Sequence, residues 1–319
     1  MMQQPTVRQD IQPNEPLWQR LWHYQAERFP LAKHSVLIAA FSFWAVSLSA
    51  LLRGASTWPM WQSSLTAFVC VLLFFLQLRI ADEFKDAAND AQYRPERPVP
   101  RGLVTLSELR WVGLVAALIQ LSLAFWLDPW LLLPLVGVWG YMVLMRVEFG
   151  VPVWLQRHPF AYLWTHMLIV PLIDFFATAT DWLPHHHGTS VPLLWFLAVS
   201  FFNGVVIEIG RKTWAPVQER EGVESYSSAW GIQWAVSVWF AAVGLAFLCA
   251  LVVAEAINFF WPVFTILLLA LMGVGWIGLR FVRQPTANRA TTLDTVSGLW
   301  VAGLYLILGI VPLGVQQWF

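Results

Sequence analysis

Residues 62–81 read QSSLTAFVCVLLFFLQLRIA, an almost wholly apolar stretch whose single charge is Arg79. A helix needs about 20 mainly apolar residues to cross the hydrocarbon core of a bilayer. This stretch therefore predicts a membrane-spanning helix. The next nine positions, 82–90, read DEFKDAAND, so the apolar span ends abruptly in a strongly polar segment.

Similar apolar stretches run through the whole chain, and they predict an all-α, polytopic membrane protein. The composition agrees, because 58% of the residues are hydrophobic and 12% are charged, against about 25% charged residues in soluble domains. Lys and Arg balance Asp and Glu at 19 each, so no basic field for nucleic acid exists and the lipid bilayer is the expected partner. The nine predicted spans are residues 34–52, 62–81, 103–127, 129–145, 159–180, 191–210, 230–253, 258–280 and 295–316.

The distribution of basic residues predicts the orientation in the membrane. With the N-terminus in the cytoplasm, all of the 19 Lys and Arg residues except Arg53 fall on the cytoplasmic side, as the positive-inside rule requires. The N-terminus and the two long polar connections, 82–102 and 211–229, are then cytoplasmic, and the C-terminus lies on the opposite side.

The chain divides into a cytoplasmic segment, residues 1–33, and a nine-helix transmembrane domain, residues 34–319. Apolar and aromatic residues recur within residues 15–29. They indicate either an amphipathic helix on the membrane surface or a loosely ordered tail.

Three aspartates follow the second span at intervals of four residues: Asp82, Asp86 and Asp90. This spacing places their carboxylates on one face of a helix, where like charges repel. A divalent cation would offset the repulsion. Mg²⁺ is the best candidate, because it takes oxygen ligands and bridges to substrate phosphates.

The following stretch, RPERPVPRG at residues 94–102, adds three guanidinium groups that suit phosphate oxygens. Carboxylates for a metal beside arginines for an anion predict a site for a metal–diphosphate complex. The alternative is a solvated, salt-bridged loop.

This segment resembles the first aspartate-rich motif of the UbiA superfamily of intramembrane prenyltransferases, N-D-x-x-D-x-x-x-D followed by R-P-x-x-x-G. Asp82 and Glu83 stand at the first two motif positions, and Arg97, Pro98 and Gly102 match the tail. The resemblance implies a ring of nine helices around a central cavity. It also implies Mg²⁺-dependent transfer of a prenyl group from an isoprenoid diphosphate to a small hydrophobic or aromatic acceptor, the reaction of a transferase of alkyl groups other than methyl.

The family's second motif, D-x-x-x-D, is expected at the end of the sixth span. Glu208 takes its first position, and Lys212 stands where the second acid is expected. The resemblance implies that Asp82, Asp86, Asp90 and Glu208 act in catalysis, with Glu83 and Glu219 as further metal ligands. Alternatively, Arg211 and Lys212 form a basic cap at the C-terminal end of a helix. Lys33 and Arg157 would then extend their side chains to the membrane edge. The expected diphosphate contacts are Lys33, Arg94, Arg97, Arg101, Arg157, Arg211 and Lys212.

Asp174 and His166 both lie within the fifth span. Asp174 is a candidate for orienting an acceptor or taking a proton, or it is simply paired. His166 is expected to be a core histidine with satisfied hydrogen bonds. Other functions also fit the sequence. They are a terpene cyclase of the same superfamily, which the 21 Trp residues favour, a transporter or permease, and a lipid-binding or structural membrane protein.

Overall fold

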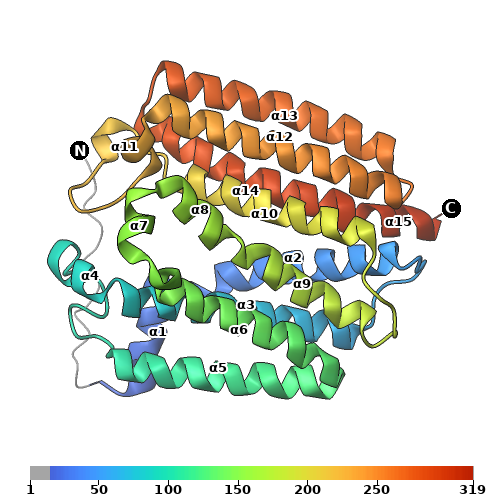
Figure 1. Cartoon of the computed structure of the whole chain (residues 1–319), viewed down its shortest axis with the longest axis horizontal. Helices are drawn as coiled ribbons and strands as arrows, with labels where there is room; N and C mark the ends of the chain where they lie inside the picture. The colour runs from blue at the N-terminus through green and yellow to red at the C-terminus, as the bar shows by residue number, and fades with distance from the viewer. Residues whose placement is uncertain (1–14, 319) are drawn as a thin grey trace.

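A computed structural model describes residues 15–318 of the chain, apart from the side chains of Lys33 and residues 316–318. The described residues form helices joined by loops, without a strand (Figure 1). Within them, nine helical segments are long and apolar enough to cross a membrane. The prediction of an all-α, nine-span architecture is confirmed, and the chain is an integral multi-pass membrane protein.

The spans agree closely with the apolar segments of the sequence. The first four are α2 (Leu31–Leu52), α3 (Trp61–Lys85), α5 (Leu106–Leu127) and α6 (Leu132–Arg146), the last preceded by η1 (Pro129–Leu131). The fifth is broken into α8 (Pro159–Met167) and α9 (Ile169–Trp182). The last four are α10 (Val191–Arg211), α12 (Ile232–Ala256), α13 (Phe260–Arg283) and α14 (Ala287–Gly309), which α15 (Val311–Trp318) follows.

Most of the short helices gather at one end of the bundle, which we call the loop end (Figure 1). The opposite end, with α15, is the far end. The orientation of the two ends in the membrane stays a prediction. The short elements of the loop end are α1 (Leu17–Arg28), α4 (Ala87–Tyr93), η2 (Glu148–Gly150), α7 (Pro152–Arg157), η3 (Pro216–Gln218) and α11 (Tyr226–Trp230).

The spans form a closed ring, as predicted. Following the chain, α2, α3, α5, α6, α9, α10, α12, α13 and α14 each contact the next, and α14 contacts α2 again. Further contacts join α2 to α9 and α10 to α14, which draws the helices together across the ring. The central cavity that the resemblance implies stays a prediction.

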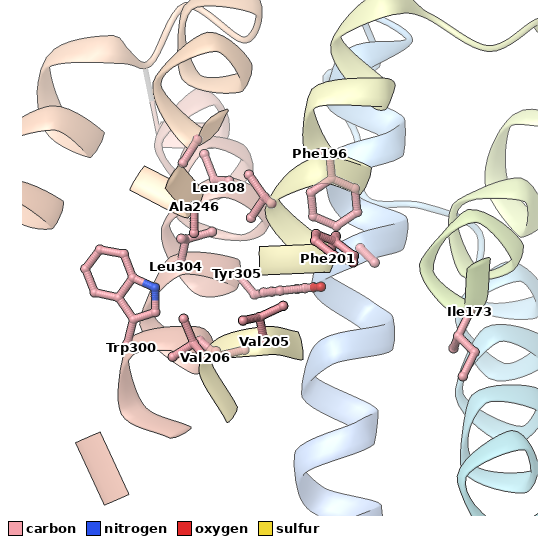
Figure 2. Packing of buried hydrophobic residues seen from close by; sticks show 14 of the residues in the cluster. Ile173, Phe196, Phe201, Val205, Val206, Ala246, Trp300, Leu304, Tyr305 and Leu308 are labelled. Carbon is pink, nitrogen blue, oxygen red and sulfur yellow. The ribbon is translucent and has the colours of Figure 1, made fainter. Parts of the chain in front are cut away.

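Close packing fixes the loop end of α10. An added Cβ at Gly210 would lie 2.1 Å from Oγ of Ser297 on α14, so only glycine permits this approach. The same Oγ accepts a hydrogen bond of 2.9 Å from Nε1 of the buried Trp239 on α12. Further along, Figure 2 shows Phe196 and Val205 of α10 in the same cluster as Tyr305 of α14.

The N-terminal segment contains a helix, α1, rather than a loose tail. Its Trp18 and Trp22 side chains are exposed, as an amphipathic interfacial helix would require, but its position on the membrane surface stays a prediction. Three ion pairs join α1 to the bundle: Arg20 with Glu108 at 2.6 Å, Glu27 with Arg101 at 2.7 Å, and Arg28 with Glu83 at 2.5 Å.

At the far end, the Asp181 carboxylate of α9 is completely buried and binds Arg53. Arg53 Nη2 lies 3.0 Å from Asp181 Oδ1, and Ser49 Oγ donates to Oδ2 at 2.9 Å. The pair explains how the one basic residue outside the predicted cytoplasmic side is accommodated.

We expect Arg53→Met to lower the free energy of unfolding by about 3–5 kcal/mol, because it leaves the Asp181 carboxylate buried without a counterion. Chemical unfolding of the protein in detergent measures the change. Arg283→Met is the control, since Arg283 is exposed and its substitution should cost no more than about 0.5 kcal/mol. Equal unfolding of the two variants would contradict a role for the buried pair.

Candidate active site

Charged side chains at the loop end of α10 form a compact ion-pair cluster. Glu208 Oε2 lies 2.6 Å from Arg211 Nη2, and Glu208 Oε1 lies 2.9 Å from Lys212 Nζ. Residues three and four apart share one helix face, which explains why one carboxylate reaches both cations. Two cations face one carboxylate, so the cluster keeps one positive charge in excess.

The end of α3 brings a carboxylate to this cluster. Asp82 is half-exposed, and the charge of Arg211 acts on it. Its nearest cation is Arg79, whose Nη1 lies 3.5 Å from Oδ2. The ends of α3 and α10, far apart in sequence, therefore place opposite charges within electrostatic reach of each other.

The three aspartates of the first motif keep the expected backbone spacing. The amide of Asp86 donates to the carbonyl of Asp82, and that of Asp90 to the carbonyl of Asp86, both at 2.8 Å. Their carboxylates nevertheless have different surroundings. Asp90 is buried and binds Arg94 at 3.3 Å and Arg97 at 2.5 Å. Asp86, at the break between α3 and α4, has no ion pair among the described residues.

Glu83 turns away from these aspartates. Successive helical residues are rotated by about 100°, so the residue after Asp82 faces another side of α3. Glu83 is buried there and accepts a hydrogen bond of 2.5 Å from Arg28 of α1. The structure does not bring it into the group expected to bind metal.

Glu219, another predicted ligand, stabilises the loop between α10 and α12. It accepts hydrogen bonds from Ser225 Oγ at 2.8 Å and from Ser227 Oγ at 2.7 Å. Its oxygens are therefore engaged within the loop itself.

The remaining predicted residues do not join the cluster. Arg101 binds Glu27 of α1, and Arg157 is exposed on α7. Asp174 lies deeper in the bundle, where Ser200 Oγ donates a hydrogen bond to its carboxylate. The side chain of Lys33 lies outside the described residues.

Sequence reasoning missed a second group beside the cluster. Lys85 Nζ lies 2.6 Å from Glu148 Oε1 and donates to Tyr162 Oη at 2.7 Å. His166 stacks on Tyr162 with ring centroids 3.8 Å apart. The position of Lys85 inside the first motif could have indicated a functional role for it. No spacing pattern in the sequence, however, indicates that Glu148 and Tyr162 lie close to it.

His166 is only partly the satisfied core histidine that the sequence predicts. Its Nδ1 lies 2.9 Å from the carbonyl of Tyr162, which can only accept, so Nδ1 carries the proton of this bond. Its Nε2 is buried without a hydrogen-bond partner among the described residues. The charges of Lys85, Glu148 and Glu208 all act on this ring, which places it beside the candidate site.

Tyr226 of α11 adds a neutral hydrogen-bond donor. Its ring is buried, and burial together with the negative charge of Glu208 raises the pKa of its hydroxyl well above the ordinary value. The hydroxyl therefore stays protonated at neutral pH and can donate to an anionic ligand.

The carboxylates fit a metal site of a particular kind. In the described part of the chain, no three His, Cys, Asp or Glu side chains are grouped as ligands of one ion. Mg²⁺, however, usually keeps several waters and uses one or two carboxylates together with substrate phosphates. Asp82 and Asp86 meet that requirement. Glu208 does not, because both of its oxygens are bound to cations.

The two loops at this end of the bundle touch each other. Gly222, in the loop after α10, has a φ of +71°, and an added Cβ would lie 2.6 Å from the ring of Tyr93 on α4. This contact holds the loop beside the helix that carries Asp90.

Residues 40–299 match the UbiA prenyltransferase family. The match covers most of the chain, which therefore belongs to this family. The comparison with curated proteins gives no match.

Solved structures share the fold at low sequence identity. An apo UbiA homologue from Aeropyrum pernix K1 has a TM-score of 0.65 and 13% identity, with 86% of this chain and 98% of that chain covered. A digeranylgeranylglyceryl phosphate synthase has a TM-score of 0.63 and 13% identity, over 93% and 99% of the two chains. A UbiA homologue from Archaeoglobus fulgidus bound to DMAPP and Mg²⁺ has a TM-score of 0.57 and 10% identity, over 90% and 99%.

We expect Gly222→Ala to release the loop from α4, because the new methyl group overlaps the Tyr93 ring and the backbone φ is positive. Trypsin cleavage after the exposed Arg220 should then become faster, as gel electrophoresis of timed digests would show. Gly231→Ala is a matched control, since its φ is +78° and nothing lies within 4 Å of the added Cβ. The same acceleration in both variants would mean that backbone strain, and not the Tyr93 contact, controls the loop.

Proposed function

We propose that this protein transfers a prenyl group from an isoprenoid diphosphate to a small, hydrophobic or aromatic acceptor within the membrane, in a Mg²⁺-dependent reaction. The observation that carries the proposal is that Asp82 on α3 lies within electrostatic reach of the Glu208–Arg211–Lys212 cluster on α10. A carboxylate suited to a metal and two cations suited to phosphate thus lie at the same end of an apolar bundle.

Each group has a separate role in this proposal. Arg211 and Lys212 bind the diphosphate, and Glu208 holds both cations in place. Tyr226 donates a hydrogen bond to a phosphate oxygen. Asp82 and Asp86 would hold Mg²⁺, which when bound supplies positive charge that stabilises the departing diphosphate. These fixed charges favour cleavage of the allylic C–O bond because they act on charge that develops in the transition state.

The apolar interior next to this site suits the isoprenoid chain. The described spans bury a large hydrophobic cluster, and an apolar surrounding keeps water from the reactive allylic carbon. The relatives agree with such a donor. The homologue from Archaeoglobus fulgidus was solved with DMAPP in one structure and with GPP in another, each together with Mg²⁺.

The Trp content does not favour a terpene cyclase over a transferase. More than half of the 21 Trp side chains are exposed on the described surface of the bundle, where Trp is common at membrane interfaces. These exposed side chains cannot line an internal cavity that would stabilise a cyclising cation, so the Trp content gives no reason to prefer a cyclase.

Within the first motif, we expect Asp86→Asn to weaken Mg²⁺-dependent binding of geranyl S-thiolodiphosphate by more than about 100-fold, because it removes a metal ligand. Turnover should be abolished without loss of the folded state. Calorimetric titration in nanodiscs, with Mg²⁺ or EDTA, measures the binding. Glu83→Gln is the comparison, since Glu83 binds Arg28 instead and its substitution should leave Mg²⁺-dependent binding intact. Full activity in Asp86→Asn would rule out the proposed metal role.

Lys212→Met should weaken binding of the same diphosphate analogue about tenfold, both with Mg²⁺ and with EDTA, because it removes a direct charged hydrogen bond. Asp86→Asn, in contrast, should act only when Mg²⁺ is present. The same titrations distinguish the two. Arg220→Met, at an exposed position of the same loop, controls for net charge, and an equal loss in that variant would point to a general electrostatic effect.

A further inference from the structure

A lysine stands between the two aspartates that would hold Mg²⁺. Lys85 follows Asp82 by three residues and immediately precedes Asp86. Residues three apart are neighbours on a helix surface, and an acid followed by a base is the favourable order for an ion pair. Arg79, three residues before Asp82, reaches its Oδ2 at 3.5 Å, so this spacing suffices on α3. By spacing alone, Lys85 would pair with Asp82 and compete with a metal for its carboxylate.

The structure turns the Lys85 side chain in another direction. Its Nζ lies 2.6 Å from Oε1 of Glu148 in η2 and donates to Oη of Tyr162 in α8 at 2.7 Å. The same nitrogen lies over the Tyr162 ring, 4.8 Å from the centroid. The charge of Lys85 still reaches Asp82, but the described residues contain no ion pair between Lys85 and an aspartate. The lysine is therefore held toward η2 and α8, away from the carboxylates of its own motif.

An unusual backbone presents Glu148 to the lysine. The φ angles of Glu148, Phe149 and Gly150 are +47°, +54° and +74°, and residues with a side chain adopt this region only at a cost in free energy. Phe149 fixes the turn by packing against Tyr141 and His166, with ring centroids 5.5 Å and 6.0 Å apart. Such conformations persist where their surroundings impose them, and they gather at functional sites.

The ion pair leaves neither partner a substitute in the same place. Glu148 is buried, and Lys85 is the one cation that pairs with it in the described chain. Tyr162 is a neutral hydrogen-bond partner and cannot replace the carboxylate charge. Removal of that charge would free the lysine to turn toward Asp82, the carboxylate three residues away on its own helix.

We propose that Glu148 is a positioning residue, which draws Lys85 away from Asp82 and so keeps the carboxylates of the first motif free for Mg²⁺. Tyr162 assists as the second group that holds the lysine. Neither Glu148 nor Lys85 contacts the metal or the diphosphate in this arrangement. The inference rests on the proposed function and adds a requirement of its metal site.

The test compares the unmodified full chain in nanodiscs with Glu148→Gln and with Glu148→Gln combined with Lys85→Met. Calorimetry measures binding of geranyl S-thiolodiphosphate, once with Mg²⁺ and once with EDTA. The double variant lacks both charges, so no buried carboxylate is left without a counterion. Glu108→Gln is the matched control, because it breaks another ion pair of the loop end, that of Glu108 with Arg20 at 2.6 Å.

We expect Glu148→Gln to weaken Mg²⁺-dependent binding at least about fivefold, because the freed lysine competes for Asp82 and adds an uncompensated positive charge near the metal. Binding with EDTA should not weaken. The double variant should regain the affinity of the unmodified protein, and Glu108→Gln should keep it. Removal of Lys85 would not repair a merely structural defect, so this rescue is the decisive observation.

Three results would overturn the positioning role and leave the proposed function standing. The first is unchanged Mg²⁺-dependent binding in Glu148→Gln. The second is an equal loss with Mg²⁺ and with EDTA in that variant. The third is weakened binding in the double variant, which would mean that Lys85 or Glu148 is itself needed for the ligand. The double variant decides the question alone if Glu148→Gln fails to fold.

A different result bears on the proposed function itself. If the unmodified protein does not bind the diphosphate analogue with Mg²⁺, the proposed function is overturned, and the positioning role with it.

Discussion

The ion pairs of Glu208 with Arg211 and Lys212 determine the character of the loop end. A bilayer makes isolated charge costly, so an apolar bundle can carry charged groups only where they are paired or reach water. One carboxylate here holds two cations at the end of α10. It leaves an excess positive charge whose field reaches Asp82, and this difference in sign makes the loop end suitable for a metal and an anion together.

The position of that cluster depends on packing away from it. Gly210 lets α10 approach Ser297 closely, and Trp239 of α12 donates a hydrogen bond to the Ser297 hydroxyl of α14. The end of α10 is therefore held against α12 and α14. On the other side, Gly222 sets the loop after α10 against Tyr93 of α4. The cluster is therefore held both by the transmembrane bundle and by contact between the two loops that contain the family's motifs.

The sequence predicts the spans well, because hydropathy over about 20 residues follows directly from the thickness of the bilayer. It predicts the partners of individual carboxylates poorly, because these come from distant segments. Glu83 binds Arg28, 55 positions away, and Lys85 of the first motif binds Glu148 of η2. A single sequence also cannot predict that Nε2 of His166 is buried without a hydrogen-bond partner among the described residues, because this depends on its neighbours in three dimensions.

Pyrophosphate release by the purified protein in nanodiscs tests the central claim most directly. Geranyl, farnesyl and geranylgeranyl diphosphates would each be supplied with Mg²⁺ or with EDTA, alone and with candidate aromatic acceptors or membrane extract. The account predicts release that requires Mg²⁺ and acceptor and yields a prenylated product. Mg²⁺-dependent release without acceptor, accompanied by a cyclised product, would contradict the transferase. The absence of pyrophosphate release with every donor and acceptor would contradict prenyl transfer itself.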